Sequence, residues 1–263
     1  MKIGIFDSGL GGLFIAKAIR KAMPQYEYVY LGDTKRVPYG NRSHETVLEF
    51  TKEGVEFLFK KENCALVILA CNTASARALR KIQKQYLPKN FPDRKVLGVI
   101  IPIAEEVKGF RKIGVLATEG TVNSESFPRE ILKINPKAQI YQQAAPLLVP
   151  FIENGGDKFS DPVIKEYLRP LIKKNIQILI LGCTHYPILK NNFKKMLPSH
   201  VKIISQDEIV PKKLKNYLIH HPEISTKLSK GRSARILVTD KTQTIDKLTQ
   251  KWFGDKKPKL IKL

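Results

Sequence analysis

Two stretches of the chain, VILACNT at residues 67–73 and LILGCTH at residues 179–185, have the same pattern. In each, an apolar run with the length of a buried strand ends at a cysteine, and polar residues follow at once. The two cysteines, Cys71 and Cys183, lie 183 − 71 = 112 positions apart. A buried strand that stops at a thiol and then turns polar is typical of a functional edge rather than of core alone.

Two further matches recur at nearly the same separation. Ile3-Gly4-Ile5 is echoed by Ile113-Gly114-Val115, and Val37-Pro38-Tyr39 is echoed by Val149-Pro150-Phe151. Each match alone is weak because apolar strands resemble one another. Three matches in the same order predict two similar units, each with one cysteine at the end of an equivalent strand.

Short aliphatic and β-branched runs alternate with amphipathic stretches along the chain, which indicates an α/β fold with mainly parallel sheets. The helical periods are clearest in the stretches that begin at His44 and Asp161. We expect two similar α/β domains, related by an approximate twofold, that face each other across a central cleft. The predicted strands are 2–6, 26–32, 65–70, 95–100, 112–117, 138–144, 176–182, 201–205 and 234–239.

The composition is that of a globular protein outside the membrane. The chain has 263 residues, 43% of them hydrophobic and 27% charged, which is enough for one large or two ordinary domains. No apolar run approaches the roughly 20 residues of a membrane helix. The start, MKIGIFDSGLGG, breaks off too early for a secretory signal, so we expect a cytoplasmic protein without membrane contact.

The three cysteines are too few for a disulfide framework and wrongly spaced for a structural zinc site, so no metal is expected. In a reducing compartment a free thiol is either a small buried hydrophobe or a reagent. Cys64, at the start of its strand, is predicted to be inert packing. For Cys71 and Cys183 the pattern alone leaves both interpretations open.

The net charge of +22 is the most unusual feature of the composition. Such a charge favours contact with nucleic acid or anionic surfaces. The lysines are scattered, however, and no nucleic-acid motif accompanies them, so a solvated basic surface is the simpler interpretation. A basic field would also concentrate a small anionic substrate.

The carboxyl ends of parallel strands form the edge where ligands bind, and both cysteines fall there. The residues that follow, Asn72-Thr73 and Thr184-His185, can cap the next helix and present N–H groups to a carboxylate. We expect the same helix termini to lower the cysteine pKa toward neutrality.

Two more segments reach this edge. Asp7-Ser8-Gly9 follows the first strand, and Asp33, Tyr39 and Gly40 lie in a loop after the second. The glycine spacing fits neither the dinucleotide fingerprint nor a P-loop. Asp7 is better interpreted as a carboxylate that accepts a bond from a substrate amine or tunes a thiol, although Asp7 and Asp33 can also be caps of turns.

Two thiols in one cleft suggest a two-base mechanism, in which one thiolate removes a proton from carbon and one thiol donates to the opposite face. A cysteine hydrolase with His185 as base is a rival, but it leaves Cys71 without a role. His185 can also be a capping or core histidine. Glu153, at the end of LLVPFIE, can be a solvated surface residue.

The motifs FDSGLGGL, GDTKRVPYG, LACNTASA, GVLATEGTVNS and ILGCTHYP, in this order, resemble the glutamate racemase family of the aspartate/glutamate racemase superfamily. The resemblance covers residues 3 to about 205 well and the tail more loosely. It implies interconversion of L- and D-glutamate without a cofactor, for peptidoglycan synthesis and cell shape. It also implies a homodimer and a C-terminal return to the first domain, which gives domains of 1–95 plus 208–263 and 96–207.

The resemblance also implies roles for single residues. Cys71 corresponds to the thiol that handles the D-glutamate proton and Cys183 to the thiol that handles the L-glutamate proton, while Asp33 and Glu153 match acidic positions that support activity. The implied substrate contacts are Asp7, Ser8, Tyr39, Gly40, Asn72, Thr73, Thr184 and His185. The chain departs from the family at 205–208, where Ser-Gln-Asp-Glu stands in place of an Asp-Ser-Gly segment.

Two other functions remain open from the sequence. A racemase of another acidic amino acid, such as aspartate, would use the same chemistry with different pocket dimensions. A basic nucleic-acid-binding protein would use the charge instead. A contact with DNA gyrase, which is attributed to some relatives, is conceivable from the charge, and no motif in the sequence supports it.

Overall fold

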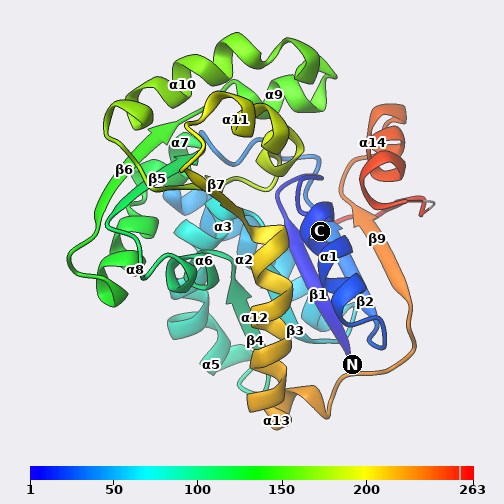
Figure 1. The fold of residues 1–263 in the computed structure, drawn as a ribbon. Coiled ribbons are helices and arrows are strands. Elements are labelled where there is room, and N and C mark those ends of the chain that lie inside the picture. The colour runs from blue at the N-terminus through cyan, green and yellow to red at the C-terminus, as the bar shows by residue number, and fades with distance from the viewer. Residues whose placement is uncertain (255) are drawn as a thin grey trace.

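The structure, a computed structural model, describes residues 1–254 and 256–263, without the side chains of residues 157 and 158. It contains a six-stranded sheet with the order β10-β9-β2-β1-β3-β4 and a four-stranded sheet with the order β6-β5-β7-β8. Every pair of neighbouring strands is parallel. The α/β class with two parallel sheets is therefore confirmed (Figure 1).

All nine predicted strands are present, and β10 is an additional short strand. The strands are β1 (Lys2–Asp7), β2 (Tyr28–Gly32), β3 (Cys64–Leu69), β4 (Lys95–Gly98), β5 (Lys112–Ala117), β6 (Gln139–Ala144), β7 (Ile178–Gly182), β8 (Lys202–Ser205), β9 (Ala234–Val238) and β10 (Lys259–Leu260). With only two residues, β10 has too little pattern to be recognised from sequence.

The helices fill the connections between strands, as right-handed crossovers between parallel strands require. They are α1 (Leu13–Ala22), α2 (His44–Lys60), α3 (Asn72–Arg77), α4 (Leu79–Lys81), α5 (Leu87–Asn90), α6 (Ile100–Glu106), α7 (Glu119–Asn123), α8 (Ser126–Ile134), α9 (Leu148–Glu153), α10 (Asp161–Lys173), α11 (Lys190–Met196), α12 (Gln206–His220), α13 (Pro222–Ser225) and α14 (Gln243–Phe253). A π-helical segment (Ile82–Tyr86) and two 3₁₀ turns (Gly156–Phe159 and Tyr186–Leu189) complete them. The two helices predicted to begin at His44 and Asp161 do begin there.

The predicted internal repeat appears in the topology. The order β2-β1-β3-β4 in one sheet has the same connectivity as β6-β5-β7-β8 in the other, so β1 corresponds to β5 and β3 to β7. The two segments of one sequence match, 37–39 and 149–151, differ in conformation. Val37-Pro38-Tyr39 lies in a loop, whereas Val149-Pro150-Phe151 lies within α9.

The central strands are buried on both faces, which explains their continuous apolar sequences. Every residue of β2, β3 and β7 is buried, and so is β1 after Lys2. Helix α2 covers the six-stranded sheet with a face that includes Val47, Val55 and Leu58. Burial of this kind stabilises the fold by about 25 cal/mol for each Å² of apolar surface.

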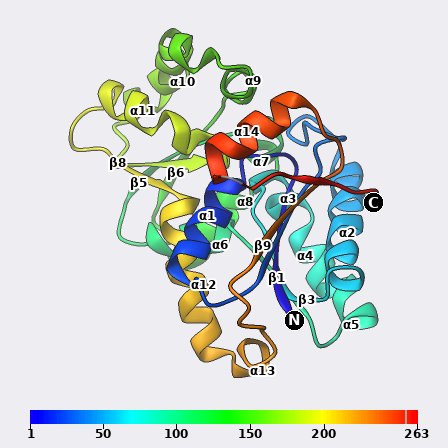
Figure 2. The same cartoon turned by 90° about the vertical axis from the view of Figure 1, so that its right-hand side faces the viewer.

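After the four-stranded sheet, the chain returns to the six-stranded one. Helix α12 packs against both α1 and α6 (Figures 1 and 2), and β9 then pairs with β2. We call residues 1–98 and 234–263 the six-stranded unit and residues 112–205 the four-stranded unit. The predicted domain limits at 95 and 208 stay a prediction.

Among the described residues, no helix is long and apolar enough to cross a membrane. The longest, α2, has 17 residues and an amphipathic sequence.

The contact between Gly54 and Phe6 gives a test of the packing of α2 on the sheet. A Cβ atom at Gly54 would overlap with Cε2 of the buried Phe6 ring. We expect Gly54→Ala to lower the free energy of unfolding by about 1–3 kcal/mol, because overpacking outweighs the gain in helix propensity of about 1 kcal/mol. Gly109→Ala is the control, since none of the described atoms lies within 4 Å of the position that its methyl group would take. Urea unfolding of both variants measures the difference, and an unchanged Gly54→Ala would contradict the packing.

Candidate active site

A cavity of about 340 Å³ lies between the two units at the carboxyl ends of their strands. Its walls come from the loops after β1, β2, β3, β5 and β7 and from α9. The lining residues are Ser8, Gly9, Val37, Pro38, Tyr39, Gly40, Asn41, Cys71, Asn72, Thr73, Thr118, Glu119, Pro146, Val149, Pro150, Glu153, Asn154, Cys183, Thr184 and His185. Both predicted catalytic cysteines therefore face one cavity.

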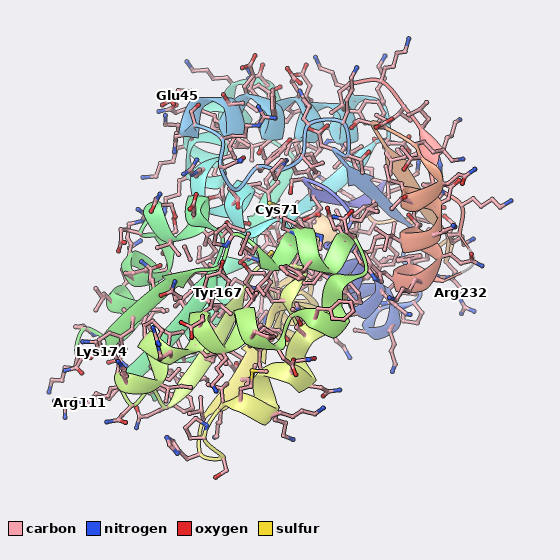
Figure 3. All side chains as sticks on the ribbon, turned by 90° about the horizontal axis from the view of Figure 1, so that it is seen from above. Glu45, Cys71, Arg111, Tyr167, Lys174 and Arg232 are labelled. Atoms are coloured by element: carbon pink, nitrogen blue, oxygen red, sulfur yellow. The ribbon has the colours of Figure 1, made fainter. Side chains whose placement is uncertain are left out.

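Cys71 follows the end of β3 after one intervening residue, Ala70, and it is the N-cap residue of α3. Its sulfur accepts hydrogen bonds from the Ala74 N–H at 3.4 Å and from the Ser8 hydroxyl at 3.3 Å. Figure 3 shows Cys71 in the interior of the molecule, between the blue and cyan N-terminal segments and the green segment of the four-stranded unit. Only 6% of the residue is exposed.

The expectation that the helix terminus lowers the pKa of Cys71 is wrong. Burial and the nearby Asp7 carboxyl raise the pKa of this thiol to about 12, although the bonds from Ser8 and Ala74 act in the opposite direction. Helix α3 has only six residues, and its terminal N–H groups do not compensate for the loss of water. Cys71 is therefore a neutral thiol at pH 7.

Cys183 has a different neighbour. Its sulfur lies 3.8 Å from Nδ1 of His185, and Nε2 of His185 lies 2.9 Å from a carboxylate oxygen of Glu153. Burial alone would lower the pKa of His185, but the contacts with Cys183 and Glu153 outweigh it and raise this pKa to about 10. The imidazole is therefore cationic at pH 7, and it lies beside the sulfur of Cys183.

Asp7 lies at the end of β1 and does not line the cavity. Its Oδ2 accepts hydrogen bonds from the Gly9 N–H at 3.1 Å and from the Tyr30 hydroxyl at 3.4 Å, while its buried Oδ1 has no partner among the described residues. Burial raises the pKa of Asp7, and the charge of His185 and the Gly12 and Gly9 N–H groups offset this effect only in part. A buried carboxyl oxygen without a donor is open to an additional cationic partner.

Asp33 also lies outside the cavity wall and acts on it through Tyr39. Its Oδ2 accepts hydrogen bonds from the Tyr39 hydroxyl at 2.5 Å and from Nε of Arg36 at 2.6 Å, and its Oδ1 accepts from Thr239. Asp33 is completely buried, with its oxygens occupied by these donors. The geometry makes it a positioning residue for the Tyr39 loop rather than a group that reaches a ligand.

Hydrogen bonds connect the two units around the cavity. The Thr73 hydroxyl lies 2.9 Å from the Thr118 hydroxyl, and the Gly120 N–H donates to the Gly40 carbonyl at 2.7 Å. Gln206, in the segment that departs from the family, donates to Oδ1 of the buried Asn72 at 3.0 Å. This segment therefore contacts the residue next to Cys71.

The other residues predicted for the site line the cavity, whereas Cys64, predicted to be inert, does not. The cavity brings together Ser8, Tyr39, Gly40, Cys71, Asn72, Thr73, Glu153, Cys183, Thr184 and His185. Cys64 is fully buried in the core of the six-stranded unit, away from this wall, and burial raises its pKa to about 12.

Thr118 and Trp252 are among the neighbours of the site that sequence reasoning missed. Thr118 follows β5 as Ser8 follows β1, so the repeat itself contained the signal for Thr118. Trp252 of α14 contacts His185 edge-on, with ring centroids 5.8 Å apart. No local pattern relates a tryptophan near the C-terminus to a histidine 67 positions earlier (252 − 185).

Comparison with known proteins agrees with this geometry. Residues 14–209 match the Asp/Glu/Hydantoin racemase family. A glutamate racemase from Sulfurihydrogenibium sp. is 39% identical, and the alignment covers 100% of this chain and 98% of that protein.

Solved structures of glutamate racemases are also similar to this chain. The glutamate racemase isoform RacE1 from Bacillus anthracis has a TM-score of 0.90 and 32% identity, with 100% of this chain and 97% of that chain covered. The glutamate racemase from Francisella tularensis in complex with D-glutamate has a TM-score of 0.89 and 34% identity, with 99% and 97% covered. The chain thus belongs to the Asp/Glu/Hydantoin racemase family.

Proposed function

We propose that the protein is a glutamate racemase that interconverts L- and D-glutamate without a cofactor, by proton transfer to and from Cys71 and Cys183. The observation that carries the proposal is that both thiols line one cavity and come from corresponding strands, β3 and β7, of two units with the same topology. Full-length relatives that are glutamate racemases, one of them solved with D-glutamate, support glutamate as the substrate.

The two sulfurs have different neighbours. A cationic His185 lies beside Cys183, whereas burial and Asp7 keep Cys71 as a thiol. A racemase that works by two bases needs one base and one acid at the start of each turnover. For the conversion of L- to D-glutamate we assign the base to Cys183 and the acid to Cys71, in line with the family resemblance.

In that direction the Cys183 thiolate removes the α-proton of L-glutamate and becomes a thiol. The Cys71 thiol donates its proton to the opposite face of the α-carbon and becomes a thiolate, so one proton is taken up and one is released. The reverse reaction starts from the opposite protonation state. No redox change or bond other than carbon–hydrogen and sulfur–hydrogen is involved.

The remaining polar groups fit an amino acid with two carboxylates. Backbone N–H groups after Cys71 and Cys183 and the hydroxyls of Ser8, Thr73 and Thr184 are donors for carboxylate oxygens. Asp7 does not line the cavity, so a contact between its Oδ1 atom, unpartnered among the described residues, and the substrate ammonium group requires movement of the cavity wall. The ammonium group would also favour the ionised state of Cys71. The net charge of +22 concentrates the anionic substrate.

The cellular setting follows from the same proposal. D-Glutamate is a component of peptidoglycan, so the enzyme would act in the cytoplasm, in cell-wall synthesis and the maintenance of cell shape. We further propose a homodimer and a division into domains near 1–95 plus 208–263 and 96–207.

Isotope exchange tests the reaction itself. Pure protein incubated with L-glutamate in D₂O, without added cofactor, is expected to form D-glutamate with deuterium at Cα, because each turnover exchanges the α-proton. Chiral chromatography and mass spectrometry measure both. Aspartate is the comparison substrate, since faster racemisation of aspartate would reassign the specificity, and absence of exchange with either amino acid would exclude racemisation.

Removal of either active-site thiol tests the assignment of the two bases. Cys71→Ala and Cys183→Ala are each expected to lower kcat/KM for racemisation by at least about a hundredfold, because general acid–base catalysis contributes about 10²–10⁴. Cys64→Ala is the matched control and is expected to keep an activity close to that of the wild type. If Cys64→Ala were the damaging change, the site assignment would be wrong.

The contact between Glu153 and His185 predicts a pH effect. Glu153 helps to raise the pKa of His185 to about 10, so in Glu153→Gln this pKa falls and the imidazolium is lost at a lower pH. The alkaline limb of kcat/KM for L-glutamate is therefore expected to move to lower pH. Asp7 and Cys183, the other charged groups that act on His185, stay in place.

Glu166→Gln is the control for this pH profile. Glu166 is a carboxylate on α10 with 62% of its side chain exposed, and it pairs with Arg169 on the same helix. Its replacement removes the same charge outside the wall of the active-site cavity. A profile of Glu153→Gln that coincides with that of Glu166→Gln would show that Glu153 does not control His185.

A further inference from the structure

A second cavity between the two units, distinct from the active site, is lined almost entirely by polar and basic side chains. Its lining residues are His44, Ala76, Arg77, Arg80, Lys81, Asn123, Ser124, Arg129 and Lys133. None of them is among the residues that line the active-site cavity. We call this second cavity the basic cavity.

Five side chains of the basic cavity are cationic, and the charge around them is compensated only in part. Arg80 and Lys133 both contact the carboxylate of Glu130, and Nε of Arg129 lies 3.7 Å from it. That single carboxylate is shared by three cations. These three side chains therefore leave a local surplus of positive charge at the basic cavity.

Arg77 and Lys81 add to this surplus. The guanidinium of Arg77 bonds to two carbonyl oxygens, those of Gly120 and Arg42, and so keeps its full charge. The pKa of His44 is lowered by burial and then by the cations Lys81 and Arg77, with Glu45 acting in the opposite direction. His44 is also the first residue of the 17-residue helix α2, whose N-terminus adds a positive partial charge.

The basic cavity joins the two units. His44 begins α2, and Arg77, Arg80 and Lys81 lie on α3 and α4, all in the six-stranded unit. Asn123 and Ser124 lie at the end of α7, and the basic side chains of α8 complete the wall from the four-stranded unit. An anion in this cavity would thus contact both units at once.

We propose that the basic cavity binds a small oligophosphate anion, held by cations of both units. Guanidinium groups match phosphate oxygens in bidentate geometry, and ammonium groups add charge without a fixed direction. A hydroxyl at Ser124 and an amide at Asn123 supply further donors. Several cations in one concave site favour an anion with several negative charges over an anion with a single carboxylate.

A compact ligand fits the observations better than a long nucleic acid. The five cationic side chains line one cavity between segments of the two units. Among the lining residues there is also no aromatic side chain of the Phe, Tyr or Trp type on which bases could stack. The ligand is therefore a chain of phosphates, free or as part of a nucleotide.

Isothermal titration calorimetry with inorganic tripolyphosphate, at constant ionic strength, tests the proposal. The wild-type protein is expected to bind one tripolyphosphate per chain, with weaker binding of sulfate. Lys81→Glu and Lys133→Glu remove one exposed cation from each unit, and each is expected to weaken binding by about tenfold or more because charge reversal replaces attraction by repulsion. Titration with ATP distinguishes the sources, since tighter binding of ATP identifies a nucleotide and equal affinity a phosphate chain alone.

Lys194→Glu and Lys195→Glu are matched controls, because both lysines are exposed on α11 and change the net charge by the same amount. Thermal melts verify that all four variants are folded. Three outcomes would overturn the proposal: no saturable binding of tripolyphosphate, equal losses in the α8 and α11 variants, or a loss in only one of Lys81→Glu and Lys133→Glu. The last outcome would show that the anion does not bridge the units.

Discussion

The carboxyl ends of two parallel strands, β3 and β7, bring Cys71 and Cys183 to one cavity. Each strand lies inside its sheet, β3 between β1 and β4 and β7 between β5 and β8, so hydrogen bonds on both sides hold its end in position. Cys183 follows the end of β7 directly, and Cys71 follows the end of β3 after one residue. The proposed reaction, in which two thiols reach one carbon atom from opposite sides, needs this rigidity, because small displacements of a catalytic group reduce proton transfer strongly.

The two units repeat each other in topology, but they differ at two positions that set the charge near the two sulfurs. Asp7 ends β1 close to Cys71, and the corresponding residue at the end of β5 is Ala117. His185 follows Cys183 by two positions, whereas Thr73 follows Cys71 by two. One sulfur therefore has an acidic neighbour and the other a basic one. The repeat thus provides two thiols at equivalent positions, and these two differences give them unlike neighbours.

The sequence predicted the elements of this site but not its electrostatics. Apolar runs located nine strands, and the repeat placed both cysteines at the same edge, because burial on two faces leaves a clear pattern. The predicted direction of the Cys71 pKa shift is wrong because the effect of burial exceeds that of a short helix terminus. The contacts of His185 with Glu153 and Trp252 depend on helices α9 and α14 folding back over the site, which no local spacing encodes.

Polar contacts lie at the boundary between the two units around the active-site cavity. Cys71 and Cys183 are each only 6% exposed, and both line that cavity. The two units meet there through the Thr73–Thr118 hydrogen bond, and the Asn72–Gln206 hydrogen bond joins the six-stranded unit to helix α12. The Asn72–Gln206 pair keeps one buried nitrogen and one buried oxygen without a partner among the described residues. Hydrogen bonds of this kind exchange with water at small net cost, whereas separation of a packed apolar interface would expose its full area. The polar contacts around the cavity can therefore open at small cost, while the apolar cluster that includes Ile3 of the six-stranded unit and Leu181 of the four-stranded unit continues to join the two units.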